Sequence, residues 1–260
     1  MRRLLAVVIL LLCSLPGLAK MQTKAVAWTS GQTQFQGYVV YDDAVTAKRP
    51  GLLMVPDWYG VTASALDKAR QQAGREYVVL VVDMYGKGVR PQSDGQAQGL
   101  VLPLLSQPEQ MRTRMQAALA AFKAQAGRVP LDTSRIGAFG FCFGGSSVLE
   151  LARSGAQLAG IVTFHGGLQT RSPALPGAVK TPLLILNGAS DLTQRSAVQP
   201  FEDEMTAAGA DWQFVNFGGA VHCFALEIAN HPGCKYDPRA AKRAYAMMHA
   251  FFAERFASNR

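Results

Sequence analysis

The sequence predicts an α/β protein with a mostly parallel central sheet flanked by helices on both faces. Three observations support this fold class. Short, continuously apolar segments alternate with longer segments of helical periodicity, as expected where buried strands alternate with helices. About half of the 260 residues are apolar, enough for one large core. No internal repeat and no linker interrupts residues 20–260, which are therefore predicted to form a single domain.

The first 19 residues have the pattern of a secretory signal peptide. Arg2 and Arg3 precede an apolar run over residues 4–12, and a small residue, Ala19, follows a Pro-Gly break. The run is shorter than the roughly 20 residues that span a bilayer. We therefore expect cleavage after Ala19 and a periplasmic or secreted mature protein without stable membrane insertion.

The first half of the sheet is predicted from alternating and apolar segments. Residues 25–29 and 34–41 alternate in polarity around Ser30-Gly31, which indicates an antiparallel hairpin. Residues 51–56 and 77–83 are continuously apolar and predict covered strands. A helix is predicted between them, over residues 63–73.

The remaining elements follow a region that breaks this pattern. Residues 89–108 are polar and contain glycine and proline, so they are predicted to form an irregular excursion over the sheet edge and part of a lid. Pro108 begins a helix to about residue 126, with apolar residues at helical spacing. Further strands are predicted over 135–141, 160–165, 182–187 and 213–217, and further helices over 144–153, 196–208 and 238–255.

A cysteine is predicted to lie at the turn between a strand and a helix. Gly140 and Gly144 stand two residues before and after Cys142, where a tight turn requires positions without side chains. The thiol then stands above the sheet edge, and the next backbone N–H can face a developing oxyanion. This is the G-x-S-x-G pattern with sulfur in place of oxygen. The alternative is a small cysteine buried as a hydrophobe.

An acid and a histidine follow the last two predicted strands. Asp191 lies in the turn after 182–187, and His222 lies in a glycine loop after 213–217. The order of Cys142, Asp191 and His222 is nucleophile, acid and base, as in the α/β-hydrolase arrangement. Asp191 would orient His222, and His222 would deprotonate the thiol. The alternatives are a turn aspartate and a loop histidine. His165 ends the strand after the cysteine turn and could neighbour the pocket, but no acid follows it at a suitable place, so it is predicted to be structural or to support the site without reacting.

Three cysteines remain after the predicted signal peptide. Cys223 and Cys234 are the natural pair, because they bracket a short loop. The alternative, a bond between Cys142 and Cys223, would block the nucleophile reversibly. The formal net charge of +8 is scattered singly or in pairs, which does not indicate nucleic-acid binding. The histidines have no convincing metal partners, and neither a metal nor a cofactor is expected.

With these motifs, the sequence resembles the dienelactone hydrolase family, from about residue 34 to residue 256. The most specific segments are 140–145, 188–191 and 220–224, followed by 236–241. The resemblance implies an α/β-hydrolase fold and a triad of Cys142, Asp191 and His222. It also implies that Asp57 stands where the family has an acid that contacts the resting thiol, and that Trp58 and Phe143 supply the backbone N–H groups of an oxyanion hole.

The resemblance fails at one substrate-binding position. Family members that act on dienelactone hold its carboxylate with two arginines, and one of these positions is Leu226 here. The loop that would carry the other arginine offers Lys87 and Arg90. We therefore expect a less polar ester or lactone than dienelactone. Four aromatic residues are predicted to line the pocket: Trp58, Tyr59, Tyr85 and Phe224.

The predicted activity is cofactor-free hydrolysis of a carboxylic ester or lactone through an acyl-enzyme on Cys142. One alternative keeps the triad but makes the protein a thioesterase or acyl-transfer enzyme. Another is a non-catalytic redox sensor on a hydrolase shell, in which Cys142 and Cys223 form a switch. The redox sensor differs from the two enzymes in that Cys142 can bond to Cys223. The two enzymes differ in whether the thiol attacks an ester or lactone, or a thioester or other acyl donor.

Overall fold

The computed structural model describes residues 21–257, so the predicted signal peptide lies outside the described residues. One large sheet has the strand order β1-β2-β4-β3-β5-β6-β7-β8. Strands β4 to β8 in this order are parallel, whereas β1 and β2 are antiparallel to their neighbours. The mostly parallel sheet of the sequence prediction is confirmed.

The hairpin at the sheet edge consists of β1 (Met21–Ser30) and β2 (Thr33–Asp42), as predicted but longer. The other strands of the sheet are β3 (Arg49–Val55), β4 (Val78–Val81), β5 (Leu131–Phe141), β6 (Ile161–Phe164), β7 (Leu183–Gly188) and β8 (Trp212–Phe217). The helices are α1 (Ala63–Ala73), α2 (Asp94–Ser106), α3 (Pro108–Lys123), α4 (Phe143–Arg153), α5 (Val198–Ala207) and α6 (Pro238–Ala257), with a short 3-10 helix at Arg195–Ala197.

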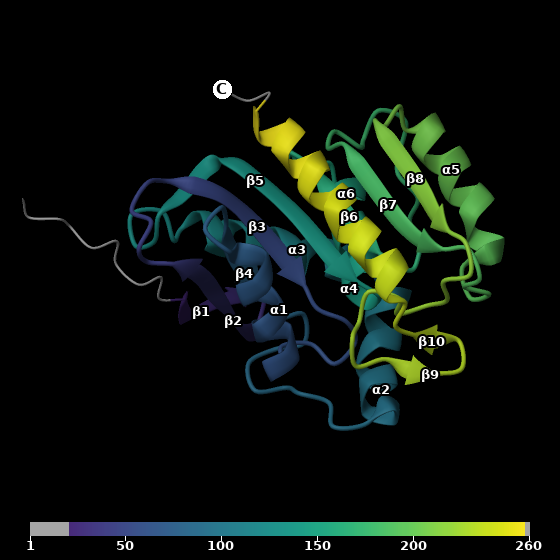
Figure 1. The fold of residues 1–260 in the computed structure, drawn as a ribbon, viewed down its shortest axis with the longest axis horizontal. Coiled ribbons are helices and arrows are strands. Elements are labelled where there is room, and N and C mark those ends of the chain that lie inside the picture. Colours follow the sequence, from purple (N-terminus) through teal and green to yellow (C-terminus); the bar gives the residue numbers. More distant parts are fainter. Residues whose placement is uncertain (1–20, 258–260) are drawn as a thin grey trace, which may run out of the picture.

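The core is divided by the sheet into two layers. Phe252 and Met248 of α6 pack with residues of α1 against one face. Met115 and Phe122 of α3 pack with residues of α4 and α5 against the other. Figure 1 shows α6 crossing the front of the sheet, with α3 and α4 behind it. Apolar side chains therefore cover both faces, which explains why the central strands are continuously apolar.

Helix α2 replaces the irregular excursion that the sequence predicted over 89–108. Ser93 caps it by accepting a hydrogen bond from a backbone N–H of the first turn. Ala97, Val101 and Leu104 are buried at helical spacing. Two glycines and the internal Pro103 lower the helix propensity of this segment, and tertiary burial overrides that preference. A small hairpin of β9 (Asn230–His231) and β10 (Cys234–Lys235) was also not predicted.

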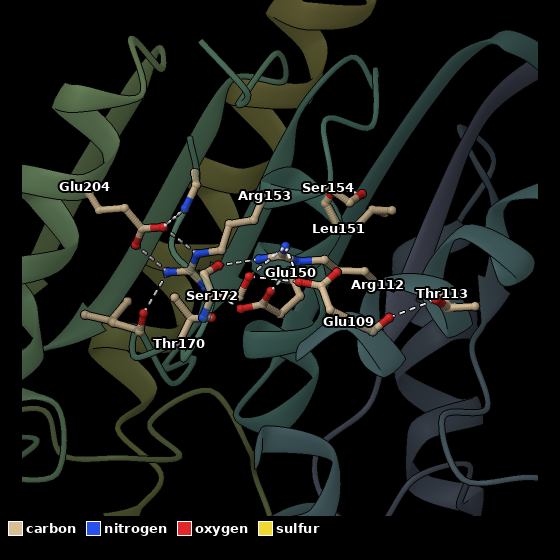
Figure 2. Close-up of polar contacts among 12 residues, drawn as sticks. Glu109, Arg112, Thr113, Glu150, Leu151, Arg153, Ser154, Thr170, Ser172 and Glu204 are labelled. Atoms are coloured by element: carbon tan, nitrogen blue, oxygen red, sulfur yellow. Dashed lines mark hydrogen bonds and ion pairs between the residues drawn. The ribbon is translucent and has the colours of Figure 1, made fainter. Parts of the chain in front are cut away.

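Buried charges join the helices on the α3–α4 side of the sheet (Figure 2). Arg153, whose side chain is 1% exposed, contacts Glu150 at 2.9 Å and Glu204 of α5 at 2.8 Å. Glu150 also accepts from Nε of Arg112 on α3 at 2.8 Å. Arg153 and Arg112 donate further to the carbonyls of Leu168 and Ser172, in the segment between β6 and β7. We call these charges the Arg153 network, and they fix that segment to three helices.

Candidate active site

Cys142 lies at a sharp turn between β5 and α4. Its φ is 53°, in the left-handed region that a side chain rarely adopts. A Cβ at Gly140 would lie 2.2 Å from the carbonyl oxygen of Gly144, and one at Gly144 would lie 2.1 Å from that of Val55. Both glycines are therefore required for β3, β5 and α4 to approach one another. The turn leaves Cys142 half-buried rather than packed in the core.

The structure brings the three predicted triad residues into one hydrogen-bonded series. His222 Nε2 lies 3.1 Å from Cys142 Sγ, and His222 Nδ1 lies 2.6 Å from Asp191 Oδ2. The other carboxylate oxygen of Asp191 accepts from the backbone N–H and the hydroxyl of Thr193, at 3.0 and 2.6 Å. Asp191 is thereby fixed in its turn with one oxygen directed at His222.

The surroundings of His222 favour its charged form. Burial alone would lower the pKa of His222, but its hydrogen bonds to Asp191 and Cys142 raise it to about 10. Burial opposes ionisation of Asp191 as well, yet hydrogen bonds from His222 and Thr193 hold the pKa of Asp191 below its usual value. The arrangement therefore stabilises an imidazolium between the sulfur of Cys142 and a carboxylate oxygen of Asp191.

Strained backbone surrounds the imidazole of His222. Among the described residues, Cys142, His165 and Cys223 are the non-glycine residues with positive φ, at 53°, 41° and 61°. The first contacts His222 through its sulfur, and the last follows it in the chain. The ring of His165 lies edge to face with that of His222, with centroids 5.1 Å apart. Such conformations cluster at functional sites.

His165 was predicted to be structural or to support the site, and the structure places its ring against that of His222. It is fully buried, and neither ring nitrogen has a hydrogen-bond partner within residues 21–257. Burial lowers the pKa of His165 well below its usual value, with a further contribution from the charge of His222. The ring is therefore a neutral neighbour of the imidazole. Its place at the end of β6, next to the cysteine turn, was the sequence signal for this proximity.

Asp57 follows β3 at the edge of the same site, where its carboxylate is hydrogen-bonded within its own turn. Its Oδ1 accepts from the backbone N–H of Tyr59 at 2.9 Å, and no hydrogen bond joins it to Cys142 among the described residues. Burial raises the pKa of Asp57, although the Tyr59 N–H and Lys68 oppose this. The shorter side chain thus closes its own turn, where the family resemblance implied a contact with the nucleophile.

Two backbone N–H groups are available at the positions predicted for an oxyanion hole. Those of Trp58 and Phe143 have no acceptor in the part of the chain that the structure describes. Tyr85, which was predicted to line the pocket, instead lies behind this site. Its hydroxyl donates to the carbonyl oxygen of Trp58 at 2.7 Å, and its ring stacks on Phe143 at 5.7 Å. Tyr85 therefore contacts both residues that carry these N–H groups, through the Trp58 carbonyl and the Phe143 ring.

A cleft of about 370 Å³ opens over the thiol. Its walls come from the turn after β3, from the start of α2 and from the loop after His222; in Figure 1 these parts lie together below the strand ends. The lining residues are Asp57, Trp58, Tyr59, Asp94, Cys142, His222, Cys223, Leu226, Ile228, Ala229, His231 and Cys234. Of the six residues predicted to form the substrate pocket, Trp58 and Tyr59 are among them.

The structure places the other predicted pocket residues outside the lining of this cleft. Phe224 is 0% exposed and packs against His165. Arg90 donates to the carbonyls of Gly86 and Val89 in its own loop, and Lys87 is exposed on that loop. In their place the cleft has mainly apolar residues between the two paired cysteines, including Leu226, the position that the family resemblance had singled out.

A disulfide joins Cys223 to Cys234, with Cα atoms 4.9 Å apart. Cys142 is the free cysteine among the described residues, so the alternative bond between Cys142 and Cys223 is not formed. The backbone N–H of Lys235 donates to the carbonyl oxygen of His222 at 3.0 Å. The far end of the loop from Cys223 to Cys234, which we call the disulfide loop, is thus fastened to His222 and to the residue that follows it.

Within residues 21–257, no helix combines the length and apolar character needed to cross a bilayer. No group of three or more histidine, cysteine or acidic side chains in that range is placed to hold a metal ion.

Comparisons with known proteins agree with this architecture. The model of the dienelactone hydrolase family matches residues 35–256. A solved structure named m3DLH is 34% identical, covers 90% of this chain and 98% of its own, and has a TM-score of 0.83. A dienelactone hydrolase-like promiscuous phosphotriesterase, P91, from metagenomic libraries is 33% identical with the same coverage and a TM-score of 0.81. A putative carboxymethylenebutenolidase of Methylorubrum extorquens is 29% identical over 73% of this chain and 67% of its own.

Proposed function

The chain belongs to the dienelactone hydrolase family, and from that premise we propose that it hydrolyses carboxylic esters or lactones through an acyl-enzyme on Cys142. Its α/β-hydrolase fold and its membership make it a hydrolase of ester bonds. The observation that carries the finer proposal is the hydrogen-bonded series from the Cys142 thiol through His222 to Asp191.

The first half of the reaction is acylation. Cys142 Sγ attacks the carbonyl carbon while its proton resides on His222 Nε2, 3.1 Å away. The carbonyl oxygen becomes an oxyanion that can accept from the N–H groups of Trp58 and Phe143. Collapse of this intermediate breaks the bond to the alkoxy oxygen, which takes the proton from Nε2. With a lactone, the released hydroxyl stays on the acyl group.

The second half is hydrolysis of the thioester. His222 Nε2 removes a proton from water as the water oxygen attacks the acyl carbon. The second tetrahedral intermediate collapses by breaking the C–S bond, and the carboxylic acid departs. Asp191, 2.6 Å from Nδ1, stabilises the imidazolium in both halves.

The substrate we propose is less polar than dienelactone. The cleft wall formed by the disulfide loop contributes Leu226, Ile228 and Ala229, which offer no charge to a substrate carboxylate. An aryl dialkyl phosphotriester is a second substrate class to test. The whole-chain similarity to the promiscuous phosphotriesterase P91 favours it.

We also propose that the mature protein is exported and periplasmic or secreted. The signal-like pattern of residues 1–19 supports this. A disulfide beside the site also suits an oxidising compartment. N-terminal sequencing of protein from the exported fraction would give Lys20 as the first residue.

The test is hydrolysis of an ester and lactone panel by the wild type and by Cys142→Ala and His222→Gln variants. Both variants should lose at least about a thousandfold in kcat/KM, because members of a triad act as a unit. His249→Gln is the matched control, since His249 stacks on Tyr77 and does not line the cleft. Iodoacetamide should inactivate the wild type in step with alkylation of Cys142. Full turnover by Cys142→Ala would refute the acyl-enzyme.

A further inference from the structure

A second cavity adjoins the cleft on the α1 side of the site. Its volume is about 160 Å³, and we call it the accessory pocket. It shares Asp57, Tyr59, Leu226 and Ile228 with the cleft, so the two cavities have a common wall. The residues that line the accessory pocket alone are Met54, Pro56, Thr62, Ser64, Ala65, Lys68 and Phe141.

Most polar side chains around the accessory pocket already have partners in the protein. Asp57 accepts from the Tyr59 N–H at 2.9 Å, and Thr62 caps α1 by accepting from a backbone N–H at 3.1 Å. The hydroxyl of Tyr59 donates to the Asp94 carboxylate. Lys68, 9% exposed, donates from Nζ to Tyr245 Oη at 3.0 Å. Bound in this way, these groups offer little to a polar ligand.

The ammonium group of Lys68 is further committed to aromatic rings. Nζ lies 5.6 Å from the ring centroid of Phe141 and 5.2 Å from that of Tyr245. Lys68 therefore lines the pocket with an ammonium group that already has a hydroxyl and two aromatic rings as partners, and its aliphatic stem adds apolar surface. With Met54, Pro56 and Phe141, the stem gives the accessory pocket an apolar interior.

The shared wall contains an apolar side chain that is largely exposed to water. Ile228 is 74% exposed although it lines both cavities, and Leu226 stands beside it. A chain that passed from the cleft into the accessory pocket would remove Ile228 from water. The gain from burying apolar surface is proportional to the area removed from solvent.

We propose that the accessory pocket binds the apolar acyl chain of the substrate, while the cleft holds the reacting carboxyl group. The inference rests on the proposed function, because the chain must be attached to an acyl group on Cys142. The acyl part is the better occupant than the alcohol, since the alcohol must leave before water attacks. An acyl chain in the accessory pocket stays bound through both halves of the reaction.

The acyl chain length should therefore control turnover. Each methylene buried in the accessory pocket should raise kcat/KM about fourfold, until the pocket is filled. The measurement is kcat/KM for p-nitrophenyl esters from acetyl to octanoyl, with the leaving group held constant. A parallel series of acetate esters with alcohols of increasing length tests whether the accessory pocket binds the alcohol part instead.

The key variant is Ala65→Trp, because Ala65 lines the accessory pocket and not the cleft. It should lower the ratio of octanoyl to acetyl kcat/KM at least tenfold. The matched control is Ala63→Trp, the same substitution on the same helix at an exposed residue that lines neither cavity. It should keep the wild-type ratio. Ala65→Leu, a smaller change, should give an intermediate ratio if the tryptophan variant does not fold.

A second readout does not depend on turnover. N-alkyl iodoacetamides of increasing length should alkylate Cys142 progressively faster in the wild type but not in Ala65→Trp. Equal chain-length profiles in the wild type and Ala65→Trp would overturn the accessory pocket and leave the hydrolase intact. A rise with alcohol length that Ala65→Trp removes would overturn the assignment to the acyl chain. Failure of the wild type on every ester would instead refute the proposed function, and the alkylation series would still test the pocket.

Discussion

Removal of the Cys223–Cys234 disulfide should affect both stability and turnover. The variant is Cys223→Ser with Cys234→Ser, which replaces each sulfur with a hydroxyl of similar size. The bond closes a loop with a sequence separation of 11 residues. In the chain-entropy relation, closing a loop of that length stabilises the folded state by about 3 kcal/mol. For a protein of this size, that corresponds to a fall in Tm of about 6–12 °C.

The effect on turnover follows from the position of His222. The disulfide loop begins at the residue after His222, and Lys235 next to Cys234 donates to the His222 carbonyl. Without the bond, the imidazole is held less firmly toward Cys142. Misplacement by about 1 Å can cost up to about a hundredfold in rate, so kcat should fall along with Tm.

The assay is thermal unfolding with and without dithiothreitol, together with ester hydrolysis at a temperature where both proteins are folded. Reductant should lower the Tm of the wild type toward that of the double variant. The double variant itself provides the control, because reductant should not change its Tm. Equal Tm values for the oxidised wild type and the double variant would refute the loop-closure argument. Equal kcat values would refute the link to His222.

Two further predictions concern charge. The pKa of His222 is raised to about 10 in the folded state, so its contribution to stability is complete below about pH 6.5 and is lost as the pH rises toward 10. The Tm advantage of the wild type over His222→Gln should therefore shrink between pH 6.5 and 10, and an advantage that grows would contradict the assigned partners. In the Arg153 network, Arg153→Met should cost about 3–5 kcal/mol in urea unfolding, because it leaves Glu204 without its cationic partner and Glu150 with Arg112 alone. Adding Glu204→Gln should recover part of that loss, and strictly additive effects would show that Arg153 and Glu204 are not coupled.

The regular elements of the fold were predictable wherever local pattern and tertiary burial agree. The helix predicted over 63–73 has those bounds in the structure, where the Thr62 side chain caps it. The strands were visible because a sheet covered on both faces requires continuous apolar runs. Helix α2 was missed because its glycines and Pro103 argue against a helix, and only its contacts with the core reveal one.

The three residues of the candidate triad could be predicted from their order in the chain, but most residues that line the cleft could not. Cys142, Asp191 and His222 were recognisable because each follows a strand, and the strand ends meet at one edge of the sheet. The contact of Asp57 with its own turn depends on one methylene of side-chain length and cannot be derived from a pattern. Leu226 and the other cleft residues of the disulfide loop have no periodicity, since the covalent bond rather than a regular element sets their positions.

The left-handed backbone at Cys142, His165 and Cys223 implies a trade-off between thermal stability and activity. Each such conformation costs about 1–3 kcal/mol for a residue with a side chain, and glycine would relieve it. A laboratory evolution experiment that selects only for heat resistance should therefore accept glycine at Cys142, whose small side chain is only half-buried and lies outside the disulfide. Selection for turnover should reject the same change, because it removes the proposed nucleophile. Opposite outcomes under the two selections would identify where this protein has exchanged robustness for catalytic geometry.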